Sequence, residues 1–421
     1  MTNHYFKPFG PKTSPTGVNV LTIAETFPSL IQPWLINHLV QISKHGGENR
    51  IFSRREEKTF SDAVREHELV SKYCCVEDNR EALLQFFLKN CLKKGVWALN
   101  QKLIKGFPDD YGKISQKERI FETLLSPAFI VKPDIIHSHV ESIGAKTNRL
   151  IKANGAPLVI TFHGLPPVGV AKTSPQMRKA YTDPAQAIFV NTEFAKSQYV
   201  SLGGPEEKIM IIPQGIDLAN WPFHSKAFPS DEKVKLLTVG RYHPDKGQKY
   251  AIDAVKKLVD EGLDIEYTLV GSGPDKEKLQ EQAKQLNIEN RVKLYTNIPD
   301  AKLREIYRES HIFILPSLRS TDGFHEETQG VVLQEAQATG LITIATKSGG
   351  IPECIDDGNS GFLVPDRDAD ALADAIAKVV QRKDEWLAIQ TAARSWVENN
   401  YSAELIGKRM NQIYRDILGR A

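Results

Sequence analysis

Short apolar segments alternate with amphipathic helical segments along almost the whole chain. The clearest apolar segments of the first part are residues 18–24, 135–136, 158–162, 187–190 and 209–212. Helical periodicity occurs between them, near residues 33–43, 80–103 and 194–202. Strands that are apolar along their whole length and separated by helices are typical of parallel sheets covered on both faces. The pattern predicts an α/β protein.

A second series of the same kind follows a polar stretch. Residues 223–232 are polar and contain Pro229, which indicates a linker. Further strands are expected at 234–239, 267–270, 292–294, 312–315 and 342–344. Two complete series predict two Rossmann-like, doubly wound domains, and ligands of such folds bind at the carboxyl ends of strands, so the domains should face a central cleft. We place them at 1–226 and 227–400, and we expect residues 401–421 to form a helix that packs back on the first domain.

Composition restricts the class of protein. The chain has 421 residues, enough for two domains of ordinary size. Its 54 basic and 52 acidic side chains give a net charge of +2, so we expect no nucleic-acid partner. The four cysteines form no Cys-x-x-Cys pair and are expected to be buried, reduced thiols. Because the sequence has no signal-like start and no apolar run of about eighteen residues, we expect a soluble, cytoplasmic protein.

Two glutamates, Glu327 and Glu335, flank the start of a predicted helix. Gly330 precedes an apolar run that ends at Gly340, so this helix should begin near Gln329 or Gly330. The free N–H groups of a first helical turn and the helix dipole favour an anion. A carboxylate at each edge of an anion site suits a ligand with a phosphate in the middle and hydroxyls at both ends. A nucleotide sugar is such a ligand.

Two cationic side chains follow the strand predicted at 234–239. Gly240 permits a tight turn, and Arg241 and Lys246 then project at the carboxyl end of the strand. Beside a helix N-terminus of the same sheet, this pair would form a clamp for a diphosphate. Two solvated surface charges are the alternative, but the position of the loop favours the clamp.

Two glycine turns occur at other strand ends of the second domain. Gly271-Ser-Gly273 lacks the third glycine of a dinucleotide fingerprint, and we expect Gly271 to line the cleft and contact the ligand. In the second turn, Pro352 suits the first position of a helix and Glu353 complements the dipole of that helix. A purely structural role is the alternative for both turns.

The ordered set of motifs resembles the retaining GT-B glycosyltransferases of family 4. The matching blocks of the second domain are Gly240-Arg241 with Lys246-Gly247, Gly271-Ser-Gly273, Leu315-Pro316-Ser317, Glu327 to Glu335, Gly349-Gly350-Ile-Pro-Glu353 and Gly361-Phe-Leu-Val364. Those of the first domain are Asp134-Ile-Ile-His137-Ser-His139, Thr161-Phe-His163-Gly164 and Ile212-Pro-Gln-Gly215-Ile-Asp217. Several blocks are most similar to bacterial exopolysaccharide and lipopolysaccharide sugar transferases.

The resemblance implies a GT-B fold and a hexosyltransferase, which moves a sugar from a nucleoside-diphosphate sugar to a hydroxyl acceptor with retention of configuration. It implies a role in polysaccharide or glycolipid synthesis, with a sugar or lipid-linked acceptor. A GT-B sugar-nucleotide epimerase and a non-catalytic nucleotide-sugar-binding protein are the alternatives.

For the donor site, the resemblance assigns Arg241 and Lys246 to the diphosphate and Glu335 to the ribose hydroxyls. The backbone N–H groups of Gly330 and Val331 would lie near the phosphates. Glu327 would contact the sugar that is transferred.

His163 matches the histidine of the first domain that faces the donor sugar and the reaction centre in the family, and a core histidine after a strand is the alternative. His137 and His139 point to the same face of a strand, and the pair alone does not make a metal site because no third ligand occurs at a recognisable spacing. We expect no metal or other cofactor, because the two cations neutralise the leaving diphosphate. The leaving phosphate can itself take the proton, so Glu327 and His163 need not act as bases.

One departure from the family concerns residues 25–34, which follow the first strand and contain no glycine, although many members have a glycine-rich loop there. The polar loop from Arg319 to Glu326 is expected to set the choice of donor or acceptor.

Residues 89–105 contain five lysines, no acid and Trp97 among aliphatic residues. Such a segment suits a peripheral contact with an anionic membrane, at its inner face. The lysines do not fall on one face of a single helix, however, which favours an ordinary solvated helix.

Overall fold

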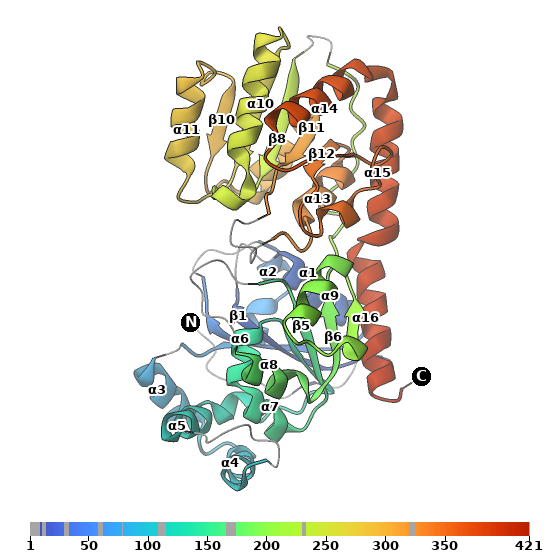
Figure 1. Ribbon diagram of the computed structural model, residues 1–421. Helices are drawn as coiled ribbons and strands as arrows, with labels where there is room; N and C mark the ends of the chain where they lie inside the picture. Colours follow the sequence, from blue (N-terminus) through green and yellow to red (C-terminus); the bar gives the residue numbers. More distant parts are fainter. Residues whose placement is uncertain are drawn as a thin grey trace.

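The structure is a computed structural model that describes residues 9–10, 14–28, 33–57, 62–77, 79–107, 115–165, 174–229, 233–319 and 326–420. The chain forms two α/β domains, each built on a parallel sheet, one above the other in Figure 1. The polar stretch between them, as far as residue 229, runs without helix or strand. Both the predicted fold class and the division into two sheets are confirmed.

The N-terminal domain contains a seven-stranded parallel sheet of order β3-β2-β1-β4-β5-β6-β7. Its strands are β1 (Val20–Thr26), β2 (Asn49–Arg55), β3 (Tyr73–Cys75), β4 (Ile135–Ser138), β5 (Leu158–Phe162), β6 (Ala185–Val190) and β7 (Ile209–Ile211). Its helices are α1 (Pro33–Lys44), α2 (Asp62–Glu66), α3 (Arg80–Asn90), α4 (Val96–Lys105), α5 (Gln116–Leu125), α6 (Glu141–Lys146), α7 (Asn148–Asn154), α8 (Pro175–Thr182) and α9 (Glu193–Ser201).

The C-terminal domain contains a six-stranded parallel sheet of order β10-β9-β8-β11-β12-β13. Its strands are β8 (Val234–Val239), β9 (Ile265–Val270), β10 (Val292–Tyr295), β11 (Ile312–Leu315), β12 (Ile342–Thr346) and β13 (Phe362–Val364). The helices that follow the linker are α10 (Gln248–Asp260), α11 (Lys276–Gln285), α12 (Asp300–Glu309), α13 (Val331–Thr339), α14 (Ala369–Gln381), α15 (Trp386–Asn400) and α16 (Ala403–Ile417).

The strand orders determine where ligands can bind. In each sheet the first strand lies inside, and the chain first builds outward on one side before it crosses to the other. The crossing places β4 beside β1 in the first sheet and β11 beside β8 in the second. A crevice forms at such a switch point, outside the carboxyl ends of the strands. The loops after β8 and β11 therefore meet at the crevice of the C-terminal domain.

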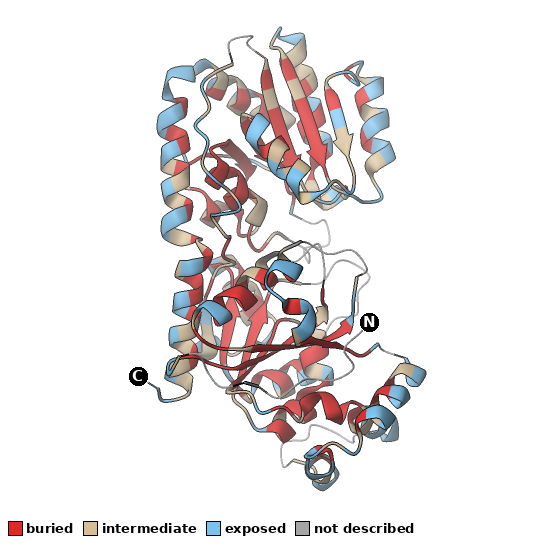
Figure 2. Cartoon of the chain, turned by 180° about the vertical axis from the view of Figure 1, so that it is seen from behind, coloured by how far each residue is buried: buried red, intermediate tan, exposed pale blue. Residues whose placement is uncertain are grey.

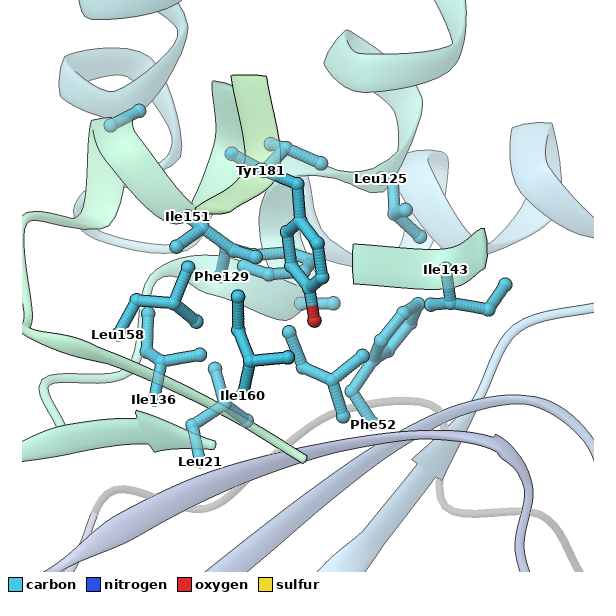
Figure 3. Packing of buried hydrophobic residues seen from close by; sticks show 14 of the residues in the cluster. Leu21, Phe52, Leu125, Phe129, Ile136, Ile143, Ile151, Leu158, Ile160 and Tyr181 are labelled. Carbon is cyan, nitrogen blue, oxygen red and sulfur yellow. The ribbon is translucent and has the colours of Figure 1, made fainter. Parts of the chain in front are cut away.

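Successive residues of the strands alternate between the two faces of the N-terminal sheet. Leu21, Phe52 and Ile160 pack around the ring of Tyr181 on one face (Figure 3). Val20 and its neighbours pack on the other face. The inner strands of both sheets are largely buried (Figure 2), as expected for parallel sheets covered on both sides, whereas the edge strands β7, β10 and β13 are partly exposed.

α15 and α16 run along one side of both domains (Figure 1). α16 returns to the N-terminal domain, where Ile406, Met410 and Tyr414 pack with Val20 and Val159 of its sheet. Among the described residues, no helix combines the length and the apolar character that a membrane span requires.

The single helix expected at 80–103 is wrong. The structure has two helices, α3 and α4, separated by a turn in which Gly95 adopts φ +100°. This conformation favours glycine and ends the helical path.

The sequence pattern also missed β2 and β3. β2 carries Arg50, Arg54 and Arg55, yet all but the last of its residues are buried. Arg54 is buried because its guanidinium lies over the Phe121 ring, 5.1 Å from the ring centroid.

All four cysteines are free, and Cys91 is only partly buried while the other three are buried.

The packing of α16 predicts that Ile406→Ala lowers the free energy of unfolding by about 3 kcal/mol, because it leaves a cavity between α16 and the N-terminal sheet. Lys408→Ala, on the exposed side of the same helix, should change it by less than about 0.5 kcal/mol. Urea midpoints of the two variants, followed by circular dichroism, measure the difference. Equal midpoints would contradict the packing of α16 described above.

Candidate active site

Lys246 and Glu327 form an ion pair at the switch point of the C-terminal sheet. Lys246 ends a short 3-10 turn (Pro244–Lys246) after β8, and Glu327 belongs to the segment that leads from β11 to α13. Gly247 explains the close approach of the two loops. A Cβ atom there would lie 1.9 Å from the carbonyl oxygen of Pro316, so only glycine fits. The Ser317 hydroxyl lies 3.5 Å from the same Glu327 carboxylate.

Arg241 is also paired with a carboxylate. One of its terminal nitrogens lies 3.2 Å from an Asp245 oxygen, and the other Asp245 oxygen lies 2.6 Å from Nδ1 of His243. The formal charges of the two cations and the two carboxylates, Asp245 and Glu327, therefore cancel. The structure places Arg241 and Lys246 on one loop, as expected, but with both charges already compensated. A diphosphate would have to replace or share these carboxylates.

Glu335 lies in α13, about one turn from the start of that helix, and only 7% of it is exposed. The Tyr307 hydroxyl, from α12, donates to its carboxylate at 3.0 Å. Burial raises the pKa of Glu335 to about 7, and the bond from Tyr307 opposes this rise. The Trp221 ring in turn packs edge-on against Tyr307, with ring centroids 4.9 Å apart. Tyr307 was not identified from the sequence because it occupies an ordinary apolar position of an amphipathic helix.

The backbone groups proposed for phosphate binding already have neighbours. The Val331 N–H donates to Gln329 O at 3.2 Å. Burial raises the pKa of the Cys354 thiol to about 11, and a hydrogen bond with the Gly330 backbone opposes this rise. Gly330 and Val331 can therefore meet a phosphate only if these contacts change. Their role stays a prediction.

Gly271 is required for packing between two strand ends. Its N–H donates to Tyr295 O at 3.0 Å, and a Cβ atom there would lie 1.9 Å from Gly240 O. The close approach of the turns after β8 and β9 accounts for this glycine. Its contact with a ligand stays a prediction.

The residues after Glu327 bind the N-terminal domain. The Thr328 hydroxyl donates to His163 O at 3.1 Å, and the Thr192 hydroxyl donates to Thr328 O at 2.8 Å. Gln329 exchanges two hydrogen bonds with the backbone of Gln214, at 2.7 and 2.9 Å. These contacts bring His163 next to the segment that carries Glu327. Thr328 and Gln329 were missed from the sequence because short polar residues in a loop carry no signal of a partner in another domain.

The expected role of Glu353 in its own helix is wrong. Residues Ile351–Cys354 form only a short 3-10 turn. The Glu353 carboxylate instead accepts from the backbone N–H groups of Glu193 and Phe194, both at 2.8 Å. Those groups start α9 of the N-terminal domain, so Glu353 caps a helix across the domain boundary. The dipole argument identified a suitable partner, but on the wrong helix.

His163 is held by three neighbours, and both of its ring nitrogens are used. The Gln214 amide donates to Nδ1 at 2.9 Å, so the ring proton lies on Nε2, which is 3.3 Å from Nδ1 of His139. The Trp34 ring lies 4.0 Å away, centroid to centroid. Burial lowers the pKa of His163 to about 3, so the ring is neutral. In this arrangement the ring offers no free basic nitrogen, and a catalytic role for His163 stays a prediction.

A third histidine joins the pair recognised in the sequence. His38 from α1 approaches His137 and His139, and the three offer nitrogen atoms within 4.8 Å of one another. Burial holds the pKa of each far below 6.5, so the rings are neutral, which is the form that binds metals. The nitrogens of His137 already lie 2.5 Å from the Tyr414 hydroxyl and 2.7 Å from that of Thr161.

A metal at this histidine cluster would therefore have to displace at least one hydroxyl. The expectation that no metal is needed stays a prediction. The cluster borders a cavity of about 40 Å³, room for about one water molecule.

Two further expectations fall partly outside the described residues, namely the glycine-free loop at residues 29–32 and the loop at residues 320–325.

Comparisons with known proteins identify the family of this two-domain arrangement. Residues 220–402 match the family described as glycosyl transferases group 1, and residues 99–220 match glycosyltransferase family 4. The amylovoran biosynthesis glycosyltransferase AmsK of Erwinia amylovora is 30% identical over 319 residues, which are 72% of this chain and 75% of that protein. The chain belongs to the family 4 glycosyltransferases.

A second curated relative and a solved structure support the same family and fold. The colanic acid biosynthesis glycosyltransferase WcaL of Escherichia coli is 27% identical and covers 77% of this chain and 79% of its own length. The crystal structure of Anabaena HepE with UDP and glucose has a TM-score of 0.70 at 16% identity, covering 95% of this chain and all of that one. The likeness to HepE shows a shared GT-B fold.

The buried carboxyl group of Glu335 predicts a pH-dependent stability. Below pH 4.5 the group is protonated in both the folded and the unfolded chain. As the pH rises from 4.5 to about 7, the group ionises in the unfolded chain but keeps its proton in the folded chain. The free energy of unfolding therefore falls by roughly 3 kcal/mol over this range. Glu335→Gln should therefore be more stable than the original chain at pH 8 and similar to it at pH 4.5. Denaturation midpoints at both pH values measure this.

The exposed Glu309→Gln, at the end of α12, serves as the control and should show no such difference. If Glu335→Gln is less stable than the original chain at pH 8, the pKa of Glu335 is not raised.

Proposed function

We propose that this glycosyltransferase transfers a sugar from a nucleoside-diphosphate sugar to a hydroxyl acceptor with retention of anomeric configuration. The observation that carries the proposal is the Lys246–Glu327 pair, which lies at the switch point of the C-terminal sheet beside the buried Glu335. A cation for the diphosphate and two carboxylates for hydroxyls occur there in the order that such a donor requires.

The pairing of charges supports a specific binding step. Without a donor, Lys246 is neutralised by Glu327 and Arg241 by Asp245. When a diphosphate enters, its oxygens replace Glu327 as the partner of Lys246. The Glu327 carboxylate is then released to accept hydrogen bonds from sugar hydroxyls. One exchange thus binds the diphosphate and prepares the sugar contact.

Catalysis then rests on stabilising the leaving group. Negative charge grows on the diphosphate as its bond to the sugar breaks, and Lys246 and Arg241 compensate this charge without a proton transfer of their own. The acceptor hydroxyl attacks from the face that the diphosphate leaves, and its proton passes to the leaving phosphate. This route requires no basic nitrogen on His163, consistent with a ring whose two nitrogens are hydrogen-bonded.

The names of the relatives support a role in polysaccharide synthesis. AmsK and WcaL are named for the synthesis of amylovoran and colanic acid. We propose that the acceptor is a sugar hydroxyl of a growing polysaccharide unit, free or lipid-linked. The donor base and sugar are to be identified by a thermal-shift panel of UDP, GDP and ADP sugars and of CMP sugars, followed by donor hydrolysis.

The exchange of partners predicts opposite effects on binding for two variants. Lys246→Ala should weaken binding of the nucleoside diphosphate and lower kcat/KM by roughly a hundredfold, because a charged contact to the leaving group is worth on the order of 3 kcal/mol. Glu327→Gln should strengthen binding of the nucleoside diphosphate, because the competing carboxylate is gone, but lower sugar transfer. Calorimetry with the diphosphate and steady-state transfer assays measure the two quantities.

Lys257→Ala is the matched control, because Lys257 forms an exposed ion pair with Asp374 of α14 outside the cleft. It should change neither quantity. Unchanged binding and turnover in both cleft variants would refute the proposed donor site. Binding without any transfer or hydrolysis of any donor would indicate a non-catalytic binding protein, and release of nucleoside diphosphate with an altered free sugar would indicate an epimerase.

A further inference from the structure

Exposed apolar side chains are concentrated in one part of the N-terminal domain. Of the ten large hydrophobic residues that are exposed in the described ranges, six lie between residues 80 and 125, on α3, α4, α5 and the turn between the first two. Leu92 is 98% exposed and Trp97 is 75% exposed. Single exposed apolar residues are normal, but a cluster of them indicates a contact surface.

The exposed residues lie on the outer sides of helices whose inner sides are well packed. Leu84 and Leu88 are four residues apart on α3, and Leu92 continues the same spacing into the turn. On the inner side of α3, Leu83 and Phe86 belong to the domain core. α3 therefore already packs one apolar side against the core, and Leu84, Leu88 and Leu92 form a second apolar stripe that is exposed.

α4 has the same organisation. Trp97 and Ile104 are seven residues apart on its outer side, while Leu99 and Leu103 on its inner side belong to the core. α3 and α4 each contact α5, so the two outer stripes belong to one helical layer. This layer lies at the end of the N-terminal domain that is remote from the C-terminal domain (Figure 1).

Positive charge is interleaved with these apolar side chains. Lys89, Lys94 and Lys105 are exposed, and the sequence contains no acidic residue between Glu81 and Asp109. The other two lysines of the segment differ. Lys102 is also exposed, but its Nζ donates to Ala153 O at 2.9 Å, and Lys93 is partly buried, so the charges of both are engaged with the fold.

The division into two helices changes the significance of the lysine spacing. On one continuous helix the five lysines would be scattered around the axis. On two helices joined by a turn, Lys89, Lys94 and Lys105 accompany the exposed leucines and Trp97. We call Leu84, Leu88, Leu92, Trp97, Ile104, Lys89, Lys94 and Lys105 the α3–α4 surface.

We propose that the α3–α4 surface docks on an anionic lipid bilayer. Aliphatic and tryptophan side chains enter the boundary between headgroups and acyl chains, and lysines beside them pair with anionic headgroups. A second copy of this chain fits less well. A two-fold interface would set the same lysines of both copies against one another without an acid to pair them. The proposal concerns binding alone and does not depend on which donor sugar is used.

Flotation of the full chain with vesicles tests the proposal. Binding is expected to vesicles of phosphatidylcholine with 30% phosphatidylglycerol and not to pure phosphatidylcholine. Changing Lys89, Lys94 and Lys105 together to Gln should weaken binding roughly a hundredfold, at about fivefold for each lysine. Leu92→Gln with Trp97→Gln should also release the chain from the vesicles.

Matched controls come from exposed residues elsewhere. Leu387→Gln removes an exposed leucine from α15, and changing Lys284, Lys378 and Lys408 together to Gln removes the same charge from other helices. Both controls should bind vesicles like the original chain. Equal binding by the α3–α4 variants and their controls would overturn the proposal.

Two further readouts separate this proposal from others. Donor hydrolysis in solution should be unchanged in the α3–α4 variants, so a failure of the proposed transferase activity does not affect the binding result. Sedimentation velocity should show monomers at the concentrations used. A dimer that dissociates when Trp97 becomes Gln, together with no vesicle binding, would overturn the proposal and assign the surface to a second copy.

Discussion

The segment from Glu327 to Gln329 is the structural element on which the cleft depends. Its first residue pairs with Lys246 of the C-terminal domain, while the next two form hydrogen bonds to His163, Thr192 and Gln214 of the N-terminal domain. The same few residues thus belong both to the proposed donor site and to the contact between the domains. Opening of the cleft would break the Thr328 and Gln329 bonds and would shift Glu327 relative to Lys246. In the proposed mechanism, donor binding and domain closure are coupled through this segment. Glu353 adds a second contact between the domains by capping α9.

The cations of the loop after β8 are compensated by carboxylates. Lys246 is largely buried with Glu327, where an isolated cation would be costly, and the more exposed Arg241 pairs with Asp245. This pairing holds the cations in place, which lowers the reorganisation required when a diphosphate arrives. No cation in the described part of the chain pairs with Glu335. Burial raises its pKa to about 7, so its protonation state can change with the ligand that it binds. The formal charges of Lys246, Arg241, Glu327 and Asp245 therefore cancel, and the proposed mechanism has a doubly charged ligand replace one of the carboxylates.

Much of the fold could be predicted from the sequence because buried parallel strands are apolar along their whole length. β5, β8 and β11 are placed correctly for this reason, and the loops after β8 and β11 carry the proposed donor site. β2 was missed because its arginines mask its burial, and the guanidinium of Arg54 lies over an aromatic ring from another helix. The break between α3 and α4 was missed because a single glycine decides it.

Contacts between residues that lie far apart in the sequence could not be predicted from sequence spacing. His38 joins His137 and His139 from a helix about a hundred residues earlier, and Glu353 caps a helix about 160 residues away. No local pattern encodes such partners. The sequence placed Arg241 and Lys246 on one loop, but their neutralisation by Asp245 and Glu327 could be seen only in three dimensions. This neutralisation turns a simple clamp into an exchange of partners.

A crystal structure of the chain with the nucleoside diphosphate that binds most tightly tests the central claim most directly. The account predicts diphosphate oxygens at Lys246 and Arg241, ribose hydroxyls at Glu335, and a Glu327 carboxylate that no longer pairs with Lys246. A nucleotide bound elsewhere, or bound at this cleft with the Lys246–Glu327 pair intact, would contradict it.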